Sequence, residues 1–161
     1  MRVLKEADVT ETYVEWLNDY EVVKFTEQRF SNHDLRTVQA FVRQKFVSEN
    51  DYLFGIFWDG SHIGNIKLGP IDWHHLTADV SYFLGSKDHW GKGIATSAVD
   101  TVVAFADSVL HLKKLNAGYY DVNIASARVL EKCGFTHQGT KVSNIVFEEK
   151  RIDNIEVGLE L

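Results

Sequence analysis

Apolar residues recur at two different spacings along this chain, and the spacing changes near residue 50. Before this point they recur every three to four residues, as on one face of a helix, over Val9–Asp19 and Leu35–Phe46. Asp8 and Glu11 are spaced as a capping box for the first helix, and Asp34 is placed to cap the second. The pattern therefore predicts two amphipathic helices at the start of the chain.

After residue 50, short runs of alternating apolar and polar residues are separated by turn sequences, a pattern typical of strands. Turns are indicated at Asp59-Gly60 and Gly69-Pro70. One further helix begins at about Ile94, and another spans Ile124–Cys133 and ends at Gly134. With a short strand at the N-terminus, the predicted strands are Tyr52–Trp58, His62–Leu68, Ala78–Leu84, Leu115–Val122, Thr136–Lys141 and Ile145–Leu159.

This order of elements predicts the fold class α/β, of the α+β kind, with four helices and about seven strands. A doubly wound parallel sheet would alternate strands and helices more regularly than this chain does. The 161 residues fit one domain, 1–161.

The composition narrows the class of protein. A formal net charge of −6, from 17 Lys and Arg against 23 Asp and Glu, argues against a nucleic-acid partner. The lone cysteine, Cys133, excludes an internal disulfide and a cysteine-based zinc site, and its apolar slot in a helix indicates a core residue. Neither a targeting segment nor a membrane span is evident, so we expect a cytoplasmic protein with no membrane partner and no metal.

The segment Tyr82–Ala95 carries the strongest chemical signal, because a strand leads through a loop with Gly91 and Gly93 directly into a helix. Backbone N–H groups at a helix N-terminus, approached closely because glycine lacks a side chain, suit a pyrophosphate. A P-loop requires Ser or Thr after its lysine, but Gly93 follows Lys92. A dinucleotide fingerprint requires a third small residue where Thr96 stands. Taken alone, the loop also fits a plain strand-to-helix turn.

Two motifs together resemble the signatures of the GCN5-related N-acetyltransferase (GNAT) family. Trp90–Ala95 is similar to the family's acyl-CoA pyrophosphate loop, Gln/Arg-x-x-Gly-x-Gly/Ala, although Trp90 departs from its first position. Asn123–Phe135 resembles the second signature, Asn-x-x-Ser/Ala followed by Glu-Lys-x-Gly-Phe. The element order also agrees with the GNAT fold. The resemblance implies a mixed central sheet that splays between the strands Ala78–Leu84 and Leu115–Val122.

The resemblance further implies an acetyl-CoA-dependent N-acetyltransferase with acetyl-CoA in the split. The pantetheine would pair with the backbone of Val80–Leu84, as an added strand does, and the pyrophosphate would bind the N–H groups of Gly91–Ala95. Asn123 and Ser126 would face the thioester end. The predicted acetyl-CoA residues are Val80, Tyr82, Phe83, Leu84, Trp90, Gly91, Lys92, Gly93, Ile94, Ala95, Asn123 and Ser126.

The chemistry calls for a base and an acid. An amine must be neutral to attack a thioester, whereas α-amino groups titrate near 8 and lysines near 10.4. Glu27 and Asp79 are the candidate general bases, although each also fits a solvated surface carboxylate. Leu130 stands where many family members have the tyrosine that protonates the leaving thiolate, so Ser126 and Tyr120 are the candidate acids. Ser126 also fits a plain helix-start serine.

Two acceptor classes remain open, with a slight preference for the first: the amino-sugar of a nucleotide-sugar, or the N-terminus of a ribosomal protein. The predicted acceptor residues are Glu27, Arg29, Phe30, Trp73 and Tyr119, with His74 and His75 at the edge of the cleft. A non-catalytic acyl-CoA-binding module is a third reading, because the usual tyrosine is absent. The protein is expected to be a monomer or a homodimer.

Overall fold

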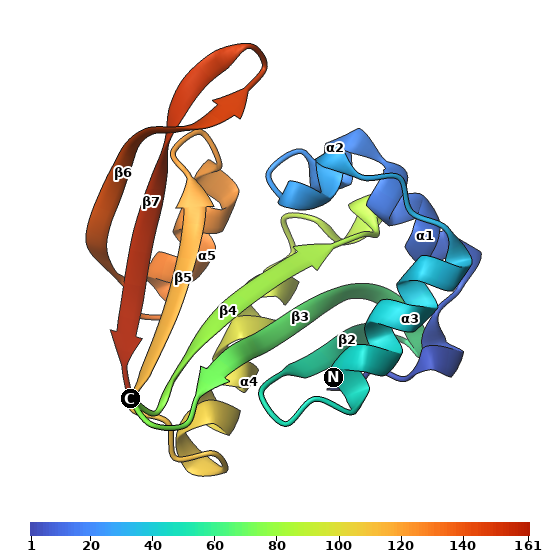
Figure 1. Cartoon of the computed structure of the whole chain (residues 1–161), viewed down its shortest axis with the longest axis horizontal. Helices are drawn as coiled ribbons and strands as arrows, with labels where there is room; N and C mark the ends of the chain where they lie inside the picture. The colour runs from blue at the N-terminus through green and yellow to red at the C-terminus, as the bar shows by residue number, and fades with distance from the viewer.

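The computed structural model describes residues 1–161 and contains one mixed sheet of seven strands (Figure 1). The strands are β1 (Arg2–Val3), β2 (Tyr52–Trp58), β3 (Ser61–Asp72), β4 (Thr77–Leu84), β5 (Lys114–Tyr120), β6 (Thr136–Phe147) and β7 (Lys150–Glu160). The α-helices are α1 (Glu11–Asn18), α2 (Tyr20–Val23), α3 (Leu35–Phe46), α4 (Ile94–Ser108) and α5 (Ile124–Lys132). Short 3₁₀ helices include η2 (Glu27–Phe30) and η3 (Lys87–His89). The spatial order of the strands is β1-β2-β3-β4-β5-β7-β6, and only β4 and β5 pair in parallel.

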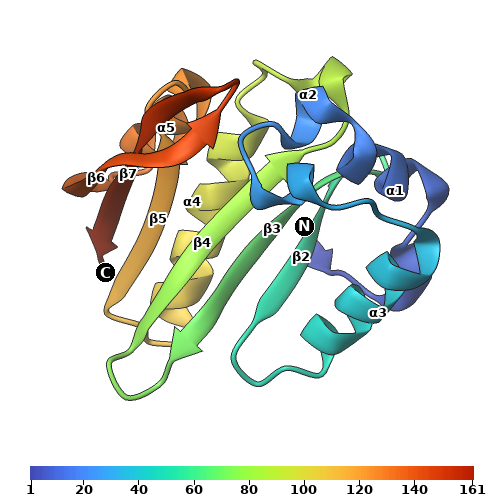
Figure 2. The same ribbon diagram turned by 45° about the horizontal axis from the view of Figure 1, so that its top comes forward.

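Helices cover both faces of the sheet, and each face has its own apolar core. Strand β2 shows the division, because Phe54 and Ile56 join the core under α4 and α5 while Leu53 joins the core under α1, α2 and α3. Figure 2 shows α4 behind the central strands and α3 on the opposite side. No helix is both long enough and apolar enough to cross a membrane.

The helices begin where side-chain oxygens cap their first N–H groups. Asp34 caps α3 as predicted, by accepting a hydrogen bond from Thr37 N at 2.7 Å. The predicted cap of α1 is wrong: Thr10 caps this helix, and the Asp8 carboxylate instead accepts from the Arg2 guanidinium. The chain also forms one helix more than the four predicted, because Asp19 caps the single turn of α2.

The Gly69-Pro70 turn predicted from the sequence is wrong, because β3 runs through it to Asp72. A register shift between Leu68 and Ile71 accommodates the proline within the strand. The Ile71 N–H then bonds to the Asn50 carbonyl at 2.7 Å, and the chain reverses only after Asp72.

The last two strands divide at a different point from the predicted one. Residues Ile145–Phe147 belong to β6, where they pair with Lys150–Ile152 of β7. The reversal falls at Glu148 and Glu149, which both adopt positive φ angles (46° and 64°). The acidic pair thus forms the tip of a long β6–β7 hairpin, which leans toward α2 at the open end of the sheet (Figure 1).

Candidate active site

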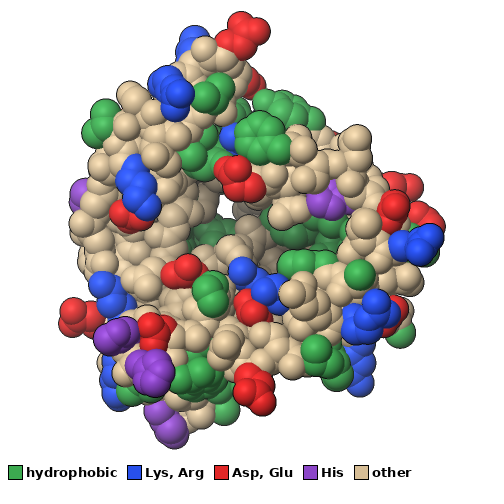
Figure 3. Space-filling view, in the orientation of Figure 1, with side chains coloured by type: hydrophobic (Ala, Val, Ile, Leu, Met, Phe, Trp, Pro, Cys, Tyr) green, Lys and Arg blue, Asp and Glu red, His purple; other side chains and the backbone are tan.

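The sheet splits between β4 and β5. These two strands pair only at Thr77–Asp79 with Lys114–Asn116, after which they diverge (Figure 1). Strand β4 stays paired with β3 as far as Leu84, so its other edge, from Val80 to Leu84, has no strand partner. In the space-filling view the molecule is hollowed between its two halves, with apolar side chains inside the hollow (Figure 3). An extended chain can add to such an edge.

The loop after β4 places a row of free backbone donors at the same end of the split. The N–H groups from Gly91 to Thr96 have no acceptor within the protein, and no side chain caps α4. Gly91 and Gly93 have φ angles of 72° and 77°, and a Cβ at either position would meet no atom within 4 Å. Free N–H groups at the positive end of a helix, open to solvent, form an anion site.

Trp90 departs from the family pattern, and the structure gives its side chain a definite partner. The indole Nε1 donates a hydrogen bond to the Leu84 carbonyl at 2.8 Å. This carbonyl belongs to the predicted pantetheine edge, so the acceptor nearest the loop is already used. The side chain remains 42% exposed beside the free N–H groups.

Ser126 meets Tyr82 across the split. The Ser126 Oγ and the Tyr82 hydroxyl lie 2.9 Å apart, and this contact joins the first turn of α5 to β4. Asn123 caps α5 through its Oδ1, which accepts from Ser126 N at 3.2 Å. Burial raises the pKa of Tyr82 to about 12, while the bond to Ser126 opposes the shift. Tyr82 therefore stays protonated at neutral pH and can donate.

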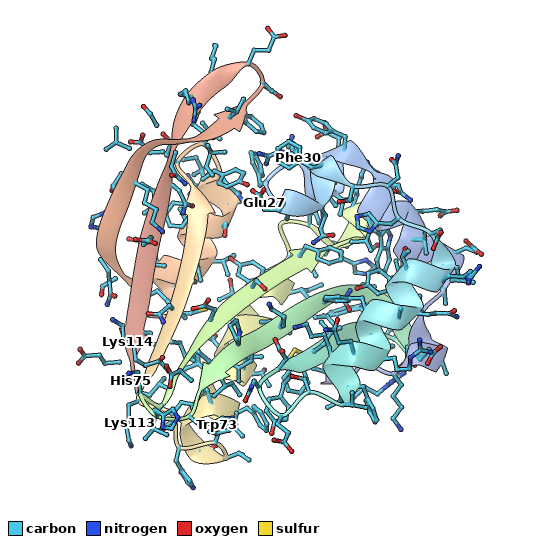
Figure 4. The ribbon with its side chains drawn as sticks, in the orientation of Figure 1. Glu27, Phe30, Trp73, His75, Lys113 and Lys114 are labelled. Carbon is cyan, nitrogen blue, oxygen red and sulfur yellow. The ribbon has the colours of Figure 1, made fainter.

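Glu27 and Tyr120 meet at the open end of the split, from segments distant in the sequence. The Tyr120 hydroxyl donates to Glu27 Oε1 at 2.5 Å and accepts from Arg29 Nη1 at 3.1 Å. Burial raises the pKa of Tyr120, and the bond to Glu27 raises it further by a smaller amount. Figure 4 shows Glu27 pointing from η2 toward the gap between the two halves. A carboxylate and a hydroxyl there form a short path for a proton.

Arg29 links the two halves rather than presenting a free cation. Its guanidinium also donates to the carbonyls of Lys24 (2.8 Å) and of Val146 in β6 (3.1 Å). The guanidinium carbon lies 4.4 Å from the centre of the Phe30 ring, which is 68% exposed. Glu27, Arg29, Tyr120 and Val146 therefore form one connection across the open end, which we call the bridge.

Two predicted acceptor residues lie elsewhere. Trp73 is at the opposite end of the sheet from Glu27 and Phe30 (Figure 4), where its indole donates to the Glu49 carbonyl and Asn50 Oδ1. Tyr119 points to the other face of β5 from Tyr120 and packs against the core under α4 and α5. The structure therefore separates both from the bridge.

Other candidates also fall outside the bridge. Asp79 is exposed at the last β4–β5 pair, beside the closed end of the split. His74 and His75 follow β3 in the turn near Trp73, and their backbone N–H groups bond to Asp72. Cys133 is half-buried, and burial raises the pKa of its thiol to about 12, so it is not a thiolate at neutral pH.

The comparisons with known proteins identify the family. A family model described as an acetyltransferase (GNAT) domain matches residues 1–136. The chain belongs to the GNAT acetyltransferase family. "Probable N-acetyltransferase YjcK" of Bacillus subtilis (strain 168) is 36% identical over 131 residues, which are 80% of this chain and 67% of YjcK. "Putative ribosomal N-acetyltransferase YdaF" of the same organism is 30% identical over 97 residues, which are 60% of this chain and 52% of YdaF.

The solved structures show the same GNAT fold. Spermidine N-acetyltransferase from Vibrio cholerae, crystallised with CoA and spermine, superposes with a TM-score of 0.86 at 17% identity, over 99% of this chain and 93% of that one. The predicted GNAT fold, with its mixed, splayed sheet, is confirmed. As a GNAT acetyltransferase, the protein is an acetyl-CoA-dependent acyltransferase.

Sequence reasoning missed three functional candidates. It used Tyr82 only for its backbone, whereas its hydroxyl meets Ser126. It did not consider Asn65 and Lys67, although two polar side chains at alternate positions of the otherwise non-polar run Ile63–Leu68 indicate one shared face. Both line a cavity beside β4.

Proposed function

We propose that this GNAT acetyltransferase moves an acetyl group from acetyl-CoA to a primary amine by direct attack within a ternary complex. One observation carries the proposal: the unpaired edge of β4 runs straight into the free N–H groups of the loop before α4. An extended pantetheine fits the first, and a pyrophosphate fits the second.

This geometry supports the following proposed binding residues. The pantetheine pairs with the backbone of Val80–Phe83, since the Leu84 carbonyl is held by Trp90. The N–H groups of Gly91–Ala95 bind the pyrophosphate, and Lys92 adds an exposed charge. Asn123, as the cap of α5, holds Ser126 at the thioester end.

Each of the two proton transfers has its own pair of residues: Glu27 with Tyr120, and Ser126 with Tyr82. The amine nitrogen forms a bond to the acetyl carbon as the carbon–sulfur bond breaks. Glu27, directly or through Tyr120, takes the proton that the amine loses, with Asp79 as the alternative base. Ser126 gives a proton to the departing sulfur and is replenished by Tyr82. The bridge thus serves the amine side of the split, and α5 serves the thiolate side.

For the acceptor, we propose a small amino-sugar, such as that of a nucleotide-sugar. Phe30 supports this proposal, because its exposed ring beside Glu27 offers an apolar face to a sugar. The alternative acceptor is the N-terminus of a ribosomal protein, which the likeness to YdaF favours. A cavity of about 360 Å³, whose lining includes Thr26 and Gln28 on either side of Glu27, has the size of a small-molecule site.

A screen of amines tests the proposed function. The purified protein is mixed with acetyl-CoA and single amines, among them amino-sugars, nucleotide amino-sugars, short peptides and polyamines, and free thiol is followed against an amine-free control. We expect thiol release that depends on the amine, with an amino-sugar as the best acceptor. Turnover confined to peptides would favour the alternative. Tight binding of acetyl-CoA without turnover on any amine would contradict the proposal.

A further inference from the structure

A cavity of about 360 Å³ lies between the helices of the N-terminal third and the faces of β3 and β4 beneath them. Its rim includes Thr26 and Gln28, the neighbours of Glu27 in the chain, and Ser81 of β4 lines it from the strand that borders the split. The cavity therefore opens beside the point where the amine would react. Half of its 14 lining residues are hydrophobic, so the polar groups among the other half decide what it binds.

Asn65 supplies one of these groups, and its orientation is fixed by its neighbours. His62 Nε2 lies 3.0 Å from the Gly64 carbonyl oxygen and 2.9 Å from Asn65 Oδ1. Because a carbonyl oxygen only accepts, Nε2 carries the proton, and the Asn65 atom that faces it is the amide oxygen. The Asn65 Nδ2 is left without a partner, although the residue is only 3% exposed. A buried donor without an acceptor is costly unless a ligand satisfies it.

Lys67 supplies the second group. It lies two residues further along β3, on the same face as Asn65, and it also lines the cavity. The side chain is half-buried and forms no ion pair. Asp51, the carboxylate that most raises the pKa of Lys67, bonds through Oδ2 to Lys45 and Ser48, at 2.9 Å each, and forms no ion pair with Lys67. Burial lowers the pKa of Lys67, as expected for a cation that lacks a close counter-charge.

We propose that the acceptor amine carries an anionic group, a carboxylate or a phosphate, which the Lys67 ammonium and the Asn65 amide bind inside this cavity. The inference rests on the proposed function and names the substrate class of the same site. The amine then lies toward Glu27, at the rim, and the anion lies on β3. A polycation such as spermine, which the Vibrio cholerae enzyme binds, would meet the Lys67 charge instead of a counter-charge.

Matched pairs of amines test this proposal. The first pair is 4-aminobutyrate and 4-aminobutan-1-ol, and the second is 2-aminoethyl phosphate and 2-aminoethanol, with spermidine as the polycation. We expect each anionic member to exceed its neutral partner in kcat/KM by about tenfold or more, since hydrogen bonds to charged groups are worth that much. The pair with the larger ratio of kcat/KM shows whether the site prefers a carboxylate or a phosphate. Equal rates within both pairs, or a preference for spermidine, would overturn the proposal.

Variants of the cavity residues test whether the preference for an anionic amine arises in this cavity. Lys67→Met should abolish the preference for the anionic amine, and Lys67→Arg should retain most of it. Asn65→Leu should weaken it, with thermal unfolding used to verify that each variant is folded. Lys113→Met is the matched control, because this exposed lysine lies at the far end of the sheet (Figure 4). A preference that survives Lys67→Met would place the anion elsewhere and contradict the proposal.

A second measurement does not need turnover, so it separates this inference from the proposed function. Lysines are methylated reductively in the presence of CoA and probes that lack the reactive amine, and the modification of Lys67 is quantified by mass spectrometry. The anionic probes are butyrate and ethyl phosphate, and their neutral partners are butan-1-ol and ethanol. We expect butyrate or ethyl phosphate to protect Lys67 while Lys113 stays reactive. The neutral partners should give no protection. Equal protection by charged and neutral probes, or none by any probe, would overturn the anion site even if acetyl transfer is observed.

Discussion

The two tyrosines nearest the split differ in their partners, and this difference separates the proposed acid from the proposed base. Tyr82 bonds to Ser126 on the side of α5, whereas Tyr120 bonds to Glu27 on the side of η2. From the sequence, Ser126 and Tyr120 were alternative candidates for the acid that protonates the leaving thiolate. Their partners instead give each a role of its own in the proposed reaction.

Removing the Ser126 hydroxyl should lower kcat with little change in the KM for acetyl-CoA. An interaction made mainly in the transition state behaves in this way. General acids typically contribute 10²–10⁴-fold, and a thiolate leaves readily, so we expect a decrease of about tenfold for Ser126→Ala. Tyr82→Phe should give a smaller decrease, because it leaves the Ser126 hydroxyl in place.

Steady-state kinetics measure this effect, with Ser108→Ala as the control for losing a serine from an exposed helix position. Tyr120→Phe should act differently, by weakening use of the amine, because its hydroxyl contacts Glu27. If Ser126→Ala and Tyr82→Phe both keep the wild-type kcat, solvent protonates the thiolate and Ser126 only supports the start of α5.

His62 should make the stability of the fold depend on pH. It lies among the rings of Tyr13, Trp16 and Phe57, and burial lowers its pKa below the ordinary value of 6.5. As the pH falls below 6.5, the unfolded chain takes up a proton at His62 that the folded protein does not. The free energy of unfolding should therefore decrease by up to about 1.4 kcal/mol per pH unit from this residue.

Urea unfolding between pH 7.5 and 5.5 measures the dependence. His62→Gln should flatten the pH profile, whereas His74→Gln, which removes an exposed histidine, should leave it unchanged. An identical slope in wild type and His62→Gln would show that carboxylates, not His62, cause the loss of stability.

At the scale of elements, the loop before α4 shows how glycine builds an anion site. Gly93 is the N-cap of α4 in a left-handed conformation, so the backbone itself turns into the helix and no side chain occupies its first N–H groups. Lys92 between the two glycines is exposed. The proposed phosphate site is therefore made by the backbone, and the lysine only adds charge.

Acetyl-CoA should raise the melting temperature, since a ligand at a hundredfold excess over its Kd adds about 2.7 kcal/mol of stability. Gly93→Val should remove most of this stabilisation, and Lys92→Ala little of it. Gly60→Val is the matched control, because Gly60 has the same open surroundings and a φ of 79° in the β2–β3 turn. The opposite ranking of Gly93 and Lys92 would indicate a site made by side chains.

For the whole molecule, the split is held at both ends. Three residue pairs join β4 to β5 at the closed end, as Thr77, Ala78 and Asp79 pair with β5. At the open end the bridge joins η2 to β5 and β6, supported by the stacked rings of Phe25 and Phe147 at 5.3 Å. The width of the split thus depends on contacts between segments far apart in the sequence.

Arg29→Met should loosen the tip of the β6–β7 hairpin. The substitution removes the bonds to Val146, Tyr120 and Lys24, and bonds from a charged donor are worth about 1.5–3 kcal/mol each. Amide hydrogen exchange at Ile145–Phe147 should therefore become faster by about tenfold or more, with little change in β2 and β3. Arg151→Met is the control, since Arg151 bonds only within the hairpin. Unchanged exchange at the tip would mean that Arg29 does not restrain it.

The sequence by itself determined the features that depend on neighbours along the chain. The spacing of apolar residues located the main helices and strands. Asp34 and Gly134 indicated the start of α3 and the end of α5, and the Gly91–Gly93 loop indicated free N–H groups before α4. Local patterns misjudged the cap of α1, the short helix α2 and the division between β6 and β7. Tertiary pairing overrode them at Pro70, which β3 accommodates in a register shift.

The tertiary structure alone decided which side chains meet. Tyr82 and Ser126 are 44 positions apart and Tyr120 and Glu27 are 93 apart, so only strand pairing and the splay bring them together. In a strand a shift of one residue turns a side chain to the opposite face, which is why Tyr119 joins the core while Tyr120 reaches the bridge. The unpartnered amide nitrogen of Asn65 likewise follows from its three-dimensional neighbours, because no local pattern fixes the direction of a buried hydrogen bond.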